Sequence, residues 1–529
     1  MRGLLQVPVG IVDKPAEQRR DLLWLNLSSA AGHVAIVGGP QSGKSTLLRT
    51  LVCALALTHT PREVQFYGLD FGGSALGPLR GLPHVGGVWT RLDTDQVRRT
   101  VAEVHQLMHR REQHFAAHNI DSMATYRDLK RRGTFADDTF GDVFLVVDGW
   151  NTLRAEYEPL EPVVADIAAR GLSFGVHLVA TATRWMDLRQ QVRDMFGTRL
   201  ELRLGDINDS VHGRRAAGAV PENRPGRGLT TDAQHFLAAL PRIDGHPEVA
   251  DLAHGTDQLV TALAEAWPGD DAPAVRMLPD TLTYDALPKP DAEGQRRERI
   301  PIGIAENDLA PVYADFSTEP HLLLFADTES GKSSFLRALA RSITTRYTPD
   351  QACVIVIDYR RSLLGAVNPD HLIGYASTSQ ATAAAVQQIS IAMNERLPGA
   401  DVTAEQLRAR NWWTGPELFL LIDDYDLVAT GPVNPLLPLL EYAAQARDIG
   451  LHIVLTRRTG GASRALYETF LARLREYGSP GIVMSGDRDE GPLLGTVKPQ
   501  RLPAGRGWLV TRRDGARLIQ LAWLPPPAE

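Results

Sequence analysis

The sequence predicts an α/β protein made of two tandem domains, each with a mostly parallel sheet and helices on both faces. Three observations lead to this prediction. The chain has 529 residues, and one domain commonly holds about 100 to 200. Its second half repeats the motifs of its first half in the same order. Within each half, short apolar runs alternate with helical periodicity, the pattern of parallel strands joined by crossover helices.

The internal repeat sets the expected domain boundaries. Lys44 and Lys332 occupy the same motif, 288 residues apart, and later landmarks recur at offsets of 275 to 279 residues. Repetition at this scale indicates two copies of one structural unit that differ by small insertions. We expect one domain at residues 1–265, a linker rich in Pro, Asp, Glu and Arg at 266–297, and a second domain at 298–529.

The elements of each domain follow from apolar patterning. Short apolar runs predict buried strands at 64–69, 143–147 and 176–182, with copies at 354–357, 418–422 and 451–456. Helices are expected at 46–57 and 95–115. The second of these has apolar residues at spacings of three, four or one, namely Val97, Val101, Val104, Leu107 and Met108. That apolar face is expected to lie on the sheet.

Composition and charge exclude several classes of protein. Hydrophobic residues make up 43% and charged residues 22% of the chain, as in soluble globular proteins. The net charge of −7 offers no general attraction to DNA. Cys53 and Cys353 are too far apart in sequence for a zinc motif and are expected to be buried thiols in a reducing cytosol. Residues 1–8 lack the apolar core of a signal peptide, and no apolar run approaches the ~20 residues that span a bilayer.

A phosphate-binding loop carries the strongest chemical signal. Residues 38–45 fit the pattern G-x-x-x-x-G-K-[ST], after an apolar strand and before a helix. The glycines let backbone N–H groups face phosphate oxygens, Lys44 reaches the β and γ phosphates of ATP, and Ser45 coordinates Mg²⁺. The expected ATP-binding residues are Gly38, Gly39, Pro40, Gln41, Ser42, Gly43, Lys44, Ser45 and Thr46.

The second domain has a variant of the same loop. It keeps Gly-Lys-Ser, but Ala326 replaces the first glycine, at an expected cost in backbone freedom. Asp327 and Glu329 lie where polyphosphate approaches, unless they point outward. The expected ATP-binding residues are Ala326, Asp327, Thr328, Glu329, Ser330, Gly331, Lys332, Ser333 and Ser334, and the alternative is a relic loop with a structural role only.

An acid at the end of a buried strand supports the Mg²⁺ shell in P-loop enzymes, and Asp148 and Asp423 occupy that place. Hydrolysis usually also needs a carboxylate just beyond this acid to orient water. The first copy has Gly149 there, and the second has Asp424. We therefore expect little turnover at the first site and slow turnover at the second. The candidate catalytic residues are Asp148, Asp423 and Asp424, and the candidate Mg²⁺ ligands are Ser45, Ser333, Asp148 and Asp423.

The motif order, with Thr181 and Thr183 ending one strand and Thr456 its copy, resembles the FtsK/SpoIIIE branch of P-loop ATPases. This resemblance implies tandem P-loop NTPase domains of the RecA/FtsK-like fold. A narrower resemblance is to the EccC ATPases of type VII (ESX) secretion. It rests on LPHVGG at 82–87, RREQHF at 110–115, RPGRG at 224–228, RRTGGASRAL at 457–466 and MSGD at 484–487.

The resemblance covers nearly the whole chain, as the second and third of the three ATPase modules of that family. It implies either a part of a longer protein or a naturally split subunit, with a membrane-bound partner carrying the first module. It further implies a cytoplasmic protein held peripherally at the inner membrane, a homo-oligomeric ring in the complete complex, and recognition of WxG100 secretion substrates by the last module.

Several residues keep two interpretations. Arg227 and Arg506, each between glycines, are possible arginine fingers toward a neighbour's γ-phosphate, or they stabilise turns. His105 and His109 are one helical turn apart, but no third metal ligand is evident nearby, which favours a solvated helix face.

Three functions compete: a secretion ATPase subunit, a DNA translocase of the same branch, and a scaffold that binds nucleotide without hydrolysing it. The net charge of −7 and the lack of a basic C-terminal region disfavour the translocase. Gly149 and Ala326 favour the scaffold over a motor for the chain alone.

Overall fold

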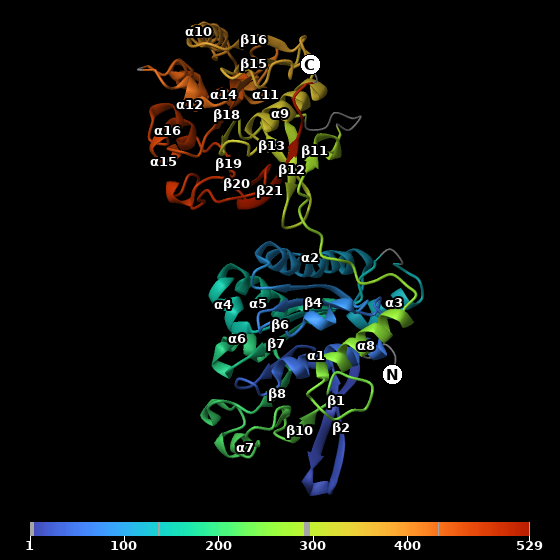
Figure 1. Cartoon of the computed structure of the whole chain (residues 1–529). Coiled ribbons are helices and arrows are strands. Elements are labelled where there is room, and N and C mark those ends of the chain that lie inside the picture. The colour runs from blue at the N-terminus through green and yellow to red at the C-terminus, as the bar shows by residue number, and fades with distance from the viewer. Residues whose placement is uncertain (1–4, 136–137, 290–296, 432, 528–529) are drawn as a thin grey trace. The chain divides into compact units, whose positions relative to one another are not determined.

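A computed structural model describes residues 5–135, 138–289, 297–431 and 433–527 (Figure 1). The chain forms two compact units, unit 1 (Met1–Met277) and unit 2 (Leu278–Glu529). The expected linker at 266–297 is divided between them, and its residues 290–296 lie outside the described ranges, as do residues 1–4 of the N-terminal segment. Part of this linker is tied into unit 1, because the Tyr67 hydroxyl donates a 2.7 Å hydrogen bond to the Pro273 carbonyl.

Unit 1 has one ten-stranded sheet in the order β2-β1-β10-β9-β8-β3-β7-β6-β4-β5. Its strands are β1 (Gln6–Lys14), β2 (Arg19–Asn26), β3 (Val34–Val37), β4 (Val64–Asp70), β5 (Val85–Thr90), β6 (Asp142–Asp148), β7 (Val176–Ala182), β8 (Thr198–Leu202), β9 (Arg227–Leu229) and β10 (His235–Ala238). Its α-helices are α1 (Lys44–Thr58), α2 (Thr94–His118), α3 (Met123–Arg131), α4 (Trp150–Glu156), α5 (Glu161–Arg170), α6 (Gln190–Met195), α7 (Arg214–Gly218) and α8 (Leu252–Ala266).

Unit 2 repeats this order as β13-β12-β21-β20-β19-β14-β18-β17-β15-β16, and β11 pairs with β21. Its strands are β11 (Leu282–Thr283), β12 (Arg299–Ala305), β13 (Pro311–Asp315), β14 (His321–Phe325), β15 (Ala352–Ile357), β16 (Leu372–Ala376), β17 (Glu417–Ile422), β18 (Leu451–Arg457), β19 (Gly481–Val483), β20 (Arg506–Thr511) and β21 (Gly515–Trp523). Its α-helices are α9 (Lys332–Arg346), α10 (Ser379–Glu395), α11 (Ala404–Ala409), α12 (Tyr425–Val428), α13 (Leu440–Ala443), α14 (Ala446–Ile449), α15 (Ala462–Ala465) and α16 (Thr469–Glu476).

The predicted fold class is confirmed in both units. Strands β8, β3, β7, β6, β4 and β5 run parallel, and β9, β10, β1 and β2 extend the sheet in antiparallel pairs. Successive residues of a central strand enter different cores: on β6, Phe144 and Val146 join the core that contains α1, and Val143 and Leu145 join the core that contains α2 and α5. Because side chains alternate across a sheet, a parallel sheet covered on both faces needs such continuous apolar strands.

The repeated Pro-x-Gly motif of the first strand has a structural reason. Both β1 and β12 change register against their hairpin partners, β1 between Pro8 and Gly10 and β12 between Pro301 and Gly303. From these glycines onward each strand also pairs with the rest of the sheet. A Cβ atom on Gly10 would lie 2.3 Å from the Leu237 carbonyl oxygen. Only glycine therefore allows the close backbone approach at this bulge.

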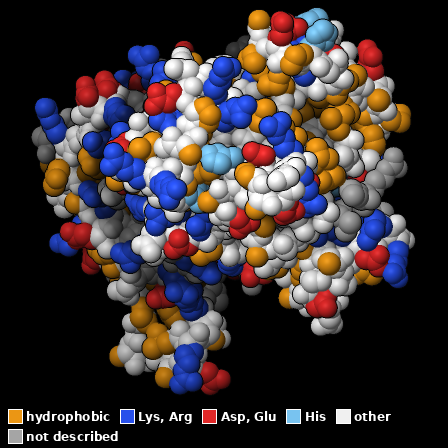
Figure 2. Space-filling view, turned by 90° about the horizontal axis from the view of Figure 1, so that it is seen from below, with side chains coloured by type: hydrophobic (Ala, Val, Ile, Leu, Met, Phe, Trp, Pro, Cys, Tyr) orange, Lys and Arg blue, Asp and Glu red, His pale blue; other side chains and the backbone are white. Residues whose placement is uncertain are grey.

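Within the described residues, no helix is both long enough and apolar enough to span a bilayer. Basic and acidic side chains are interspersed on the face shown in Figure 2.

Both cysteines are buried and reduced, as predicted. Burial raises the pKa of the Cys53 thiol to about 12 and raises the pKa of Cys353 as well. Because the thiolate is the reactive form, we expect the native chain to give no fast reaction with Ellman's reagent at pH 8, and two thiols to react after denaturation. Rapid reaction of even one thiol of the native chain, seen as release of one equivalent of thionitrobenzoate, would contradict the burial of these side chains.

Candidate nucleotide-binding sites

Each unit places a phosphate loop at the carboxyl end of a central strand. The first loop connects β3 to α1, and the second connects β14 to α9. β3 lies between β7 and β8, and β14 lies between β18 and β19. Ligands of open α/β sheets bind at this carboxyl edge, where a loop meets a helix N-terminus.

Hydrogen bonds to both neighbouring strands hold the start of each loop. In unit 1, the Gly38 N–H donates to the Ala182 carbonyl at 3.1 Å and the Gly39 N–H donates to the Arg203 carbonyl at 2.8 Å. The same two bonds in unit 2 run from Ala326 to Arg457 and from Asp327 to Ser485, at 3.0 and 2.8 Å. The loop backbone is therefore fixed before any ligand arrives.

The Gly-Arg-Gly segments hold the other end of the loops. The Gly226 N–H donates to the Ser42 carbonyl, and the Gly505 N–H donates to the Ser330 carbonyl, both at 2.9 Å. Gly43 has a φ of +99°, and a Cβ on it would lie 2.9 Å from the Gly226 nitrogen. The sequence revealed this repeated segment, but not that its glycine closes the phosphate loop.

The two candidate arginine fingers differ in their surroundings. Arg506 is buried and donates to Gln520 and to the Pro279 carbonyl, both at 3.1 Å. These bonds tie its guanidinium to its own unit and favour the turn-stabilising interpretation. Arg227 is exposed at the start of β9, so the finger interpretation remains a prediction for that residue.

The loop lysines fold back onto the loops. Lys44 Nζ donates to the Gly38 and Gly39 carbonyls at 2.8 Å, and desolvation lowers its pKa, although Asp148 opposes that shift. Lys332 Nζ donates to the Ala326 and Asp327 carbonyls at 3.3 and 3.2 Å. Both ammonium groups therefore lie inside the curve of the loop, where phosphate oxygens can replace the carbonyl contacts.

The strand-end acids share one hydrogen-bond network in the two units. The Thr181 hydroxyl donates to Asp148 Oδ1, and the Thr456 hydroxyl donates to Asp423 Oδ1, both at 2.6 Å. In unit 2 the Ser333 hydroxyl also donates to Asp423 Oδ2 at 2.6 Å. Burial raises the pKa of Asp423, and the bonds from Ser333 and Thr456 oppose that shift.

The acids fit a Mg²⁺ ion that would arrive with ATP. Asp148 Oδ2 is buried and has no hydrogen-bond partner among the described residues, so unit 1 leaves one carboxylate oxygen for a cation or its water shell. In unit 2 the corresponding oxygen already contacts Ser333, the hydroxyl that follows the loop lysine. Hard oxygen donors of this kind suit Mg²⁺.

The two units have different residues at two neighbouring positions beside these acids. Unit 1 has Gly72 and Gly149, and a Cβ on Gly72 would lie 2.6 Å from Asp148 Oδ2. The corresponding residues of unit 2 are Arg360 and Asp424, which form a 2.6 Å ion pair. Asp424 Oδ1 also lies 3.7 Å from Lys332 Nζ. Asp424 is therefore held between two cations, and sequence analysis did not identify Arg360 as its partner.

One concern about the second loop is resolved by its backbone. Ala326 is fully buried and, unlike Glu329, is not a position of positive φ, so its methyl group causes no backbone strain. The expected cost in backbone freedom is therefore wrong for this residue. Asp327 and Glu329 are both exposed, and Glu329 lines the cavity beside the loop, so it stays close to the expected path of the phosphates.

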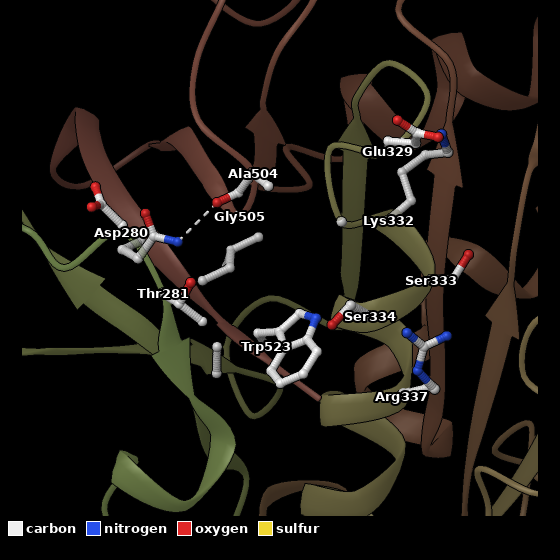
Figure 3. Close-up of a pocket in the computed structure, with 14 residues that line it drawn as sticks. Asp280, Thr281, Glu329, Lys332, Ser333, Ser334, Arg337, Ala504, Gly505 and Trp523 are labelled. Carbon is white, nitrogen blue, oxygen red and sulfur yellow. Dashed lines mark hydrogen bonds between the residues drawn. The ribbon is translucent and has the colours of Figure 1, made fainter. Parts of the chain in front are cut away.

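A cavity of about 480 Å³ lies beside the second loop. Figure 3 shows Lys332 and Ser334 on one side of it, Asp280 and Thr281 on the other, and Trp523 between them. The Leu524 carbonyl accepts hydrogen bonds from the Ser334 hydroxyl at 3.0 Å and from Arg337 Nε at 3.2 Å, which joins the end of β21 to α9. The cavity is continuous with the loop lysine and is large enough for a nucleoside.

Comparison with known proteins agrees with this geometry. The model of the FtsK/SpoIIIE family matches residues 6–245 and 290–412. The ESX secretion system protein EccC of Thermomonospora curvata is 57% identical over 522 residues, which are 99% of this chain and 39% of that protein. The ESX-1 secretion system protein EccCb1 of Mycolicibacterium smegmatis is 40% identical over 539 residues, which are 100% of this chain and 90% of that protein.

A solved structure of ATPases 2 and 3 of Thermomonospora curvata EccC, in complex with a signal sequence peptide, has the same fold. It superposes with a TM-score of 0.95 and 56% sequence identity, over 99% of this chain and 94% of that one. This chain therefore spans two ATPase modules and well under half of the full-length EccC that it resembles.

The Asp424 carboxylate should oppose nucleotide binding in unit 2, because it lies beside the lysine that receives phosphate. We expect Asp424→Asn to tighten ATP binding at this site by about tenfold, or ~1.4 kcal/mol. Binding is measured by titration with fluorescent ATP in a Lys44→Ala background that silences unit 1. The exposed loop acid Asp327, changed to Asn, is the matched control and should have a much smaller effect. An unchanged or weaker affinity in Asp424→Asn would show that this carboxylate does not compete with phosphate.

Proposed function

The chain belongs to the FtsK/SpoIIIE family and, within it, to the EccC proteins of ESX secretion systems, and we propose that it is an ATP-binding subunit of a type VII secretion machine. The observation that carries this proposal is the duplicated site, in which a clamped loop, a lysine and a strand-end acid converge in both units. Lys44, Ser45 and Asp148 would hold Mg²⁺-ATP in unit 1, and Lys332, Ser333 and Asp423 would hold it in unit 2.

We infer that the cavity beside the second loop receives the adenosine of the bound nucleotide. It opens from Lys332 and Ser333 toward Trp523, whose ring is half exposed and available for stacking. Aromatic stacking on a base contributes about 1 to 3 kcal/mol.

Turnover is proposed to be slow at both sites. Unit 1 has no side chain at Gly149 to orient water, and unit 2 holds Asp424 in the ion pair with Arg360. Bound Mg²⁺ would neutralise charge on the phosphates, and the residues of this chain would position the nucleotide more than they activate water. The non-hydrolysing scaffold is the second candidate, and Gly149 favours it for unit 1.

Substrate recognition is proposed for unit 2. The Thermomonospora curvata relative was solved with a signal sequence peptide, and we infer that unit 2 binds the C-terminal signal of a WxG100 protein. A hollow of about 480 Å³ between α16 and the ends of β19 and β20 is a suitable surface. Leu494 and Val510 line it, and Tyr467, which is 87% exposed, borders it. A large exposed aromatic ring beside an apolar hollow is typical of a protein-binding surface.

We propose that the chain works at the cytoplasmic side of the inner membrane, held there by a membrane-bound partner that carries the first ATPase module, and that copies assemble as a ring. The support is that EccC relatives contain more than this chain, which spans 39% of the Thermomonospora curvata protein. The net charge of −7 gives no general attraction to DNA and so disfavours a DNA-translocating role.

The wild-type chain should bind two equivalents of ATP with slow steady-state hydrolysis. Lys44→Ala and Lys332→Ala should each remove one equivalent, because each lysine contacts phosphate in its own unit, and Trp523→Ala should weaken only the second site. Calorimetric titration and a coupled ATPase assay check these results. The control variant Lys14→Ala removes a lysine that pairs with Asp21, 2.7 Å away on the β1–β2 hairpin. It should change neither the number of bound ATP equivalents nor the hydrolysis rate. Fast turnover that Lys44→Ala abolishes would contradict the proposed role of unit 1.

Peptide recognition by unit 2 should depend on the hollow next to α16. We expect Tyr467→Ala to weaken binding of a fluorescent C-terminal WxG100 peptide at least tenfold, as for an interface hot spot, with little dependence on ATP. Fluorescence anisotropy measures this affinity. Ile373→Ala removes an exposed apolar side chain from β16, at the opposite edge of the parallel region, and is the matched control. If the wild type, Tyr467→Ala and Ile373→Ala bind the peptide with equal affinity, the peptide binds elsewhere.

A further inference from the structure

A histidine and carboxylate cluster lies on unit 1, separate from its phosphate loop. His105 and His109 are one turn apart on α2, and Asp166 belongs to α5, which packs against α2. Among the residues that the structure describes, these form the one group of three such side chains whose ligand atoms all lie within 4.8 Å of one another. The third ligand that the sequence did not reveal is thus supplied by packing of two helices.

Three ligand atoms converge on one point of this cluster. His105 Nε2 lies 2.9 Å from Asp166 Oδ2 and 3.2 Å from His109 Nε2. A ring nitrogen carries either one proton or one lone pair, so hydrogen bonding satisfies only one of these neighbours at a time. Zinc binds nitrogen and oxygen at about 2.0 to 2.2 Å, and tetrahedral geometry places its ligand atoms about 3.3 Å apart. A cation among the three atoms would satisfy all of them, and the two spacings to His105 Nε2 are already close to that value.

Groups behind the cluster orient two of the three ligands. Glu112 Oε2 lies 3.4 Å from His109 Nδ1, the ring nitrogen that is not in the cluster. Arg170 Nη2 also lies 3.3 Å from this nitrogen. Once an ion displaces that amino group, the Glu112 carboxylate favours the tautomer that leaves Nε2 to bind a metal. Arg170 Nε lies 3.0 Å from Asp166 Oδ1 and so leaves Oδ2 to the cluster. This is the arrangement of supporting groups found around metal-binding histidines and carboxylates.

Charge and accessibility also suit a divalent cation. The side chains of His105, His109 and Asp166 are 27%, 42% and 37% exposed, so water can reach a fourth coordination position. When both histidines are neutral, the negative charges of Asp166 and Glu112 exceed the positive charge of Arg170, so the cluster has a net negative charge. One amino group of Arg170 lies 3.3 Å from His109 Nδ1 and 3.5 Å from His109 Nε2. Both contacts are long, so an ion can displace this amino group while Arg170 Nε keeps its ion pair with Asp166.

We propose that His105, His109 and Asp166 bind a divalent transition-metal ion, for which Zn²⁺ is the best match, and that the ion cross-links α2 to α5. Two imidazoles and one carboxylate with an open position are a known zinc ligand set. Both helices contribute to the same core of unit 1. The ion therefore stabilises that face of the unit without taking part in nucleotide binding.

The test is a Zn²⁺ titration of the metal-free chain, without a histidine tag, against a chromophoric chelator. We expect the wild type to bind one equivalent and to give the intense visible absorption of tetrahedral Co²⁺ when that ion is used as the probe. Asp166→Asn and His109→Gln should each weaken binding by tenfold or more, and Glu112→Gln should weaken it by about tenfold. Zn²⁺ should raise the melting temperature of the wild type but not of these variants.

The same helix provides a matched control. His114 and His118 have the same spacing on α2, with ring centroids 4.2 Å apart, but within the described residues no carboxylate completes a trio with them. His114→Gln combined with His118→Gln should leave Zn²⁺ affinity and the Co²⁺ spectrum unchanged. Zn²⁺ binding that survives in both Asp166→Asn and His109→Gln, or that is lost in the control, would overturn the proposal. Circular dichroism establishes that each variant is folded, and all five substituted positions are exposed or partly exposed.

Discussion

The backbone clamp on the phosphate loop is the constraint on which each unit depends. Two loop N–H groups donate to carbonyls at the ends of both neighbouring strands, and a glycine from a distant turn donates to a loop carbonyl from the other side. These bonds require the loop strand to lie between two parallel partners. They also require the antiparallel extension of the sheet to return the Gly-Arg-Gly turn to the loop. The central position of β3 and β14 and the long C-terminal part of each unit follow from this requirement.

The clamp is common to both units, whereas the chemistry next to it is not. The first unit keeps small residues, Gly72 and Gly149, beside Asp148, and leaves one oxygen of that acid open. The second unit fills the same space with the Arg360–Asp424 ion pair. A nucleotide that binds such sites without rapid turnover still stabilises the folded unit by mass action, by about 2.7 kcal/mol at one hundred times its dissociation constant.

Sequence analysis predicted the fold, the repeat and the phosphate loops, because these depend on local patterns: apolar runs, glycine spacing, and a lysine at the start of a helix. It missed contacts that depend on how distant segments pack. Arg360 was not identified because it follows β15 while its partner follows β17, and Asp166 was not identified because it is 57 residues beyond His109. The backbone at Ala326 was misjudged because a loop motif does not report φ, and the buried role of Arg506 depends on a carbonyl at Pro279.

The ion pair between Arg360 and Asp424 also constrains how the two copies can diverge. An aspartate at position 424 with glycine at position 360 would place a second carboxylate next to buried Asp423 without its arginine. An arginine at position 360 without Asp424 would be a half-exposed cation that water can solvate. The dependence is therefore one-sided: the buried aspartate needs the arginine more than the arginine needs the aspartate. A copy with glycine at both places acquires the pair at least cost if the arginine comes first, and transfer of the aspartate alone is the disfavoured exchange.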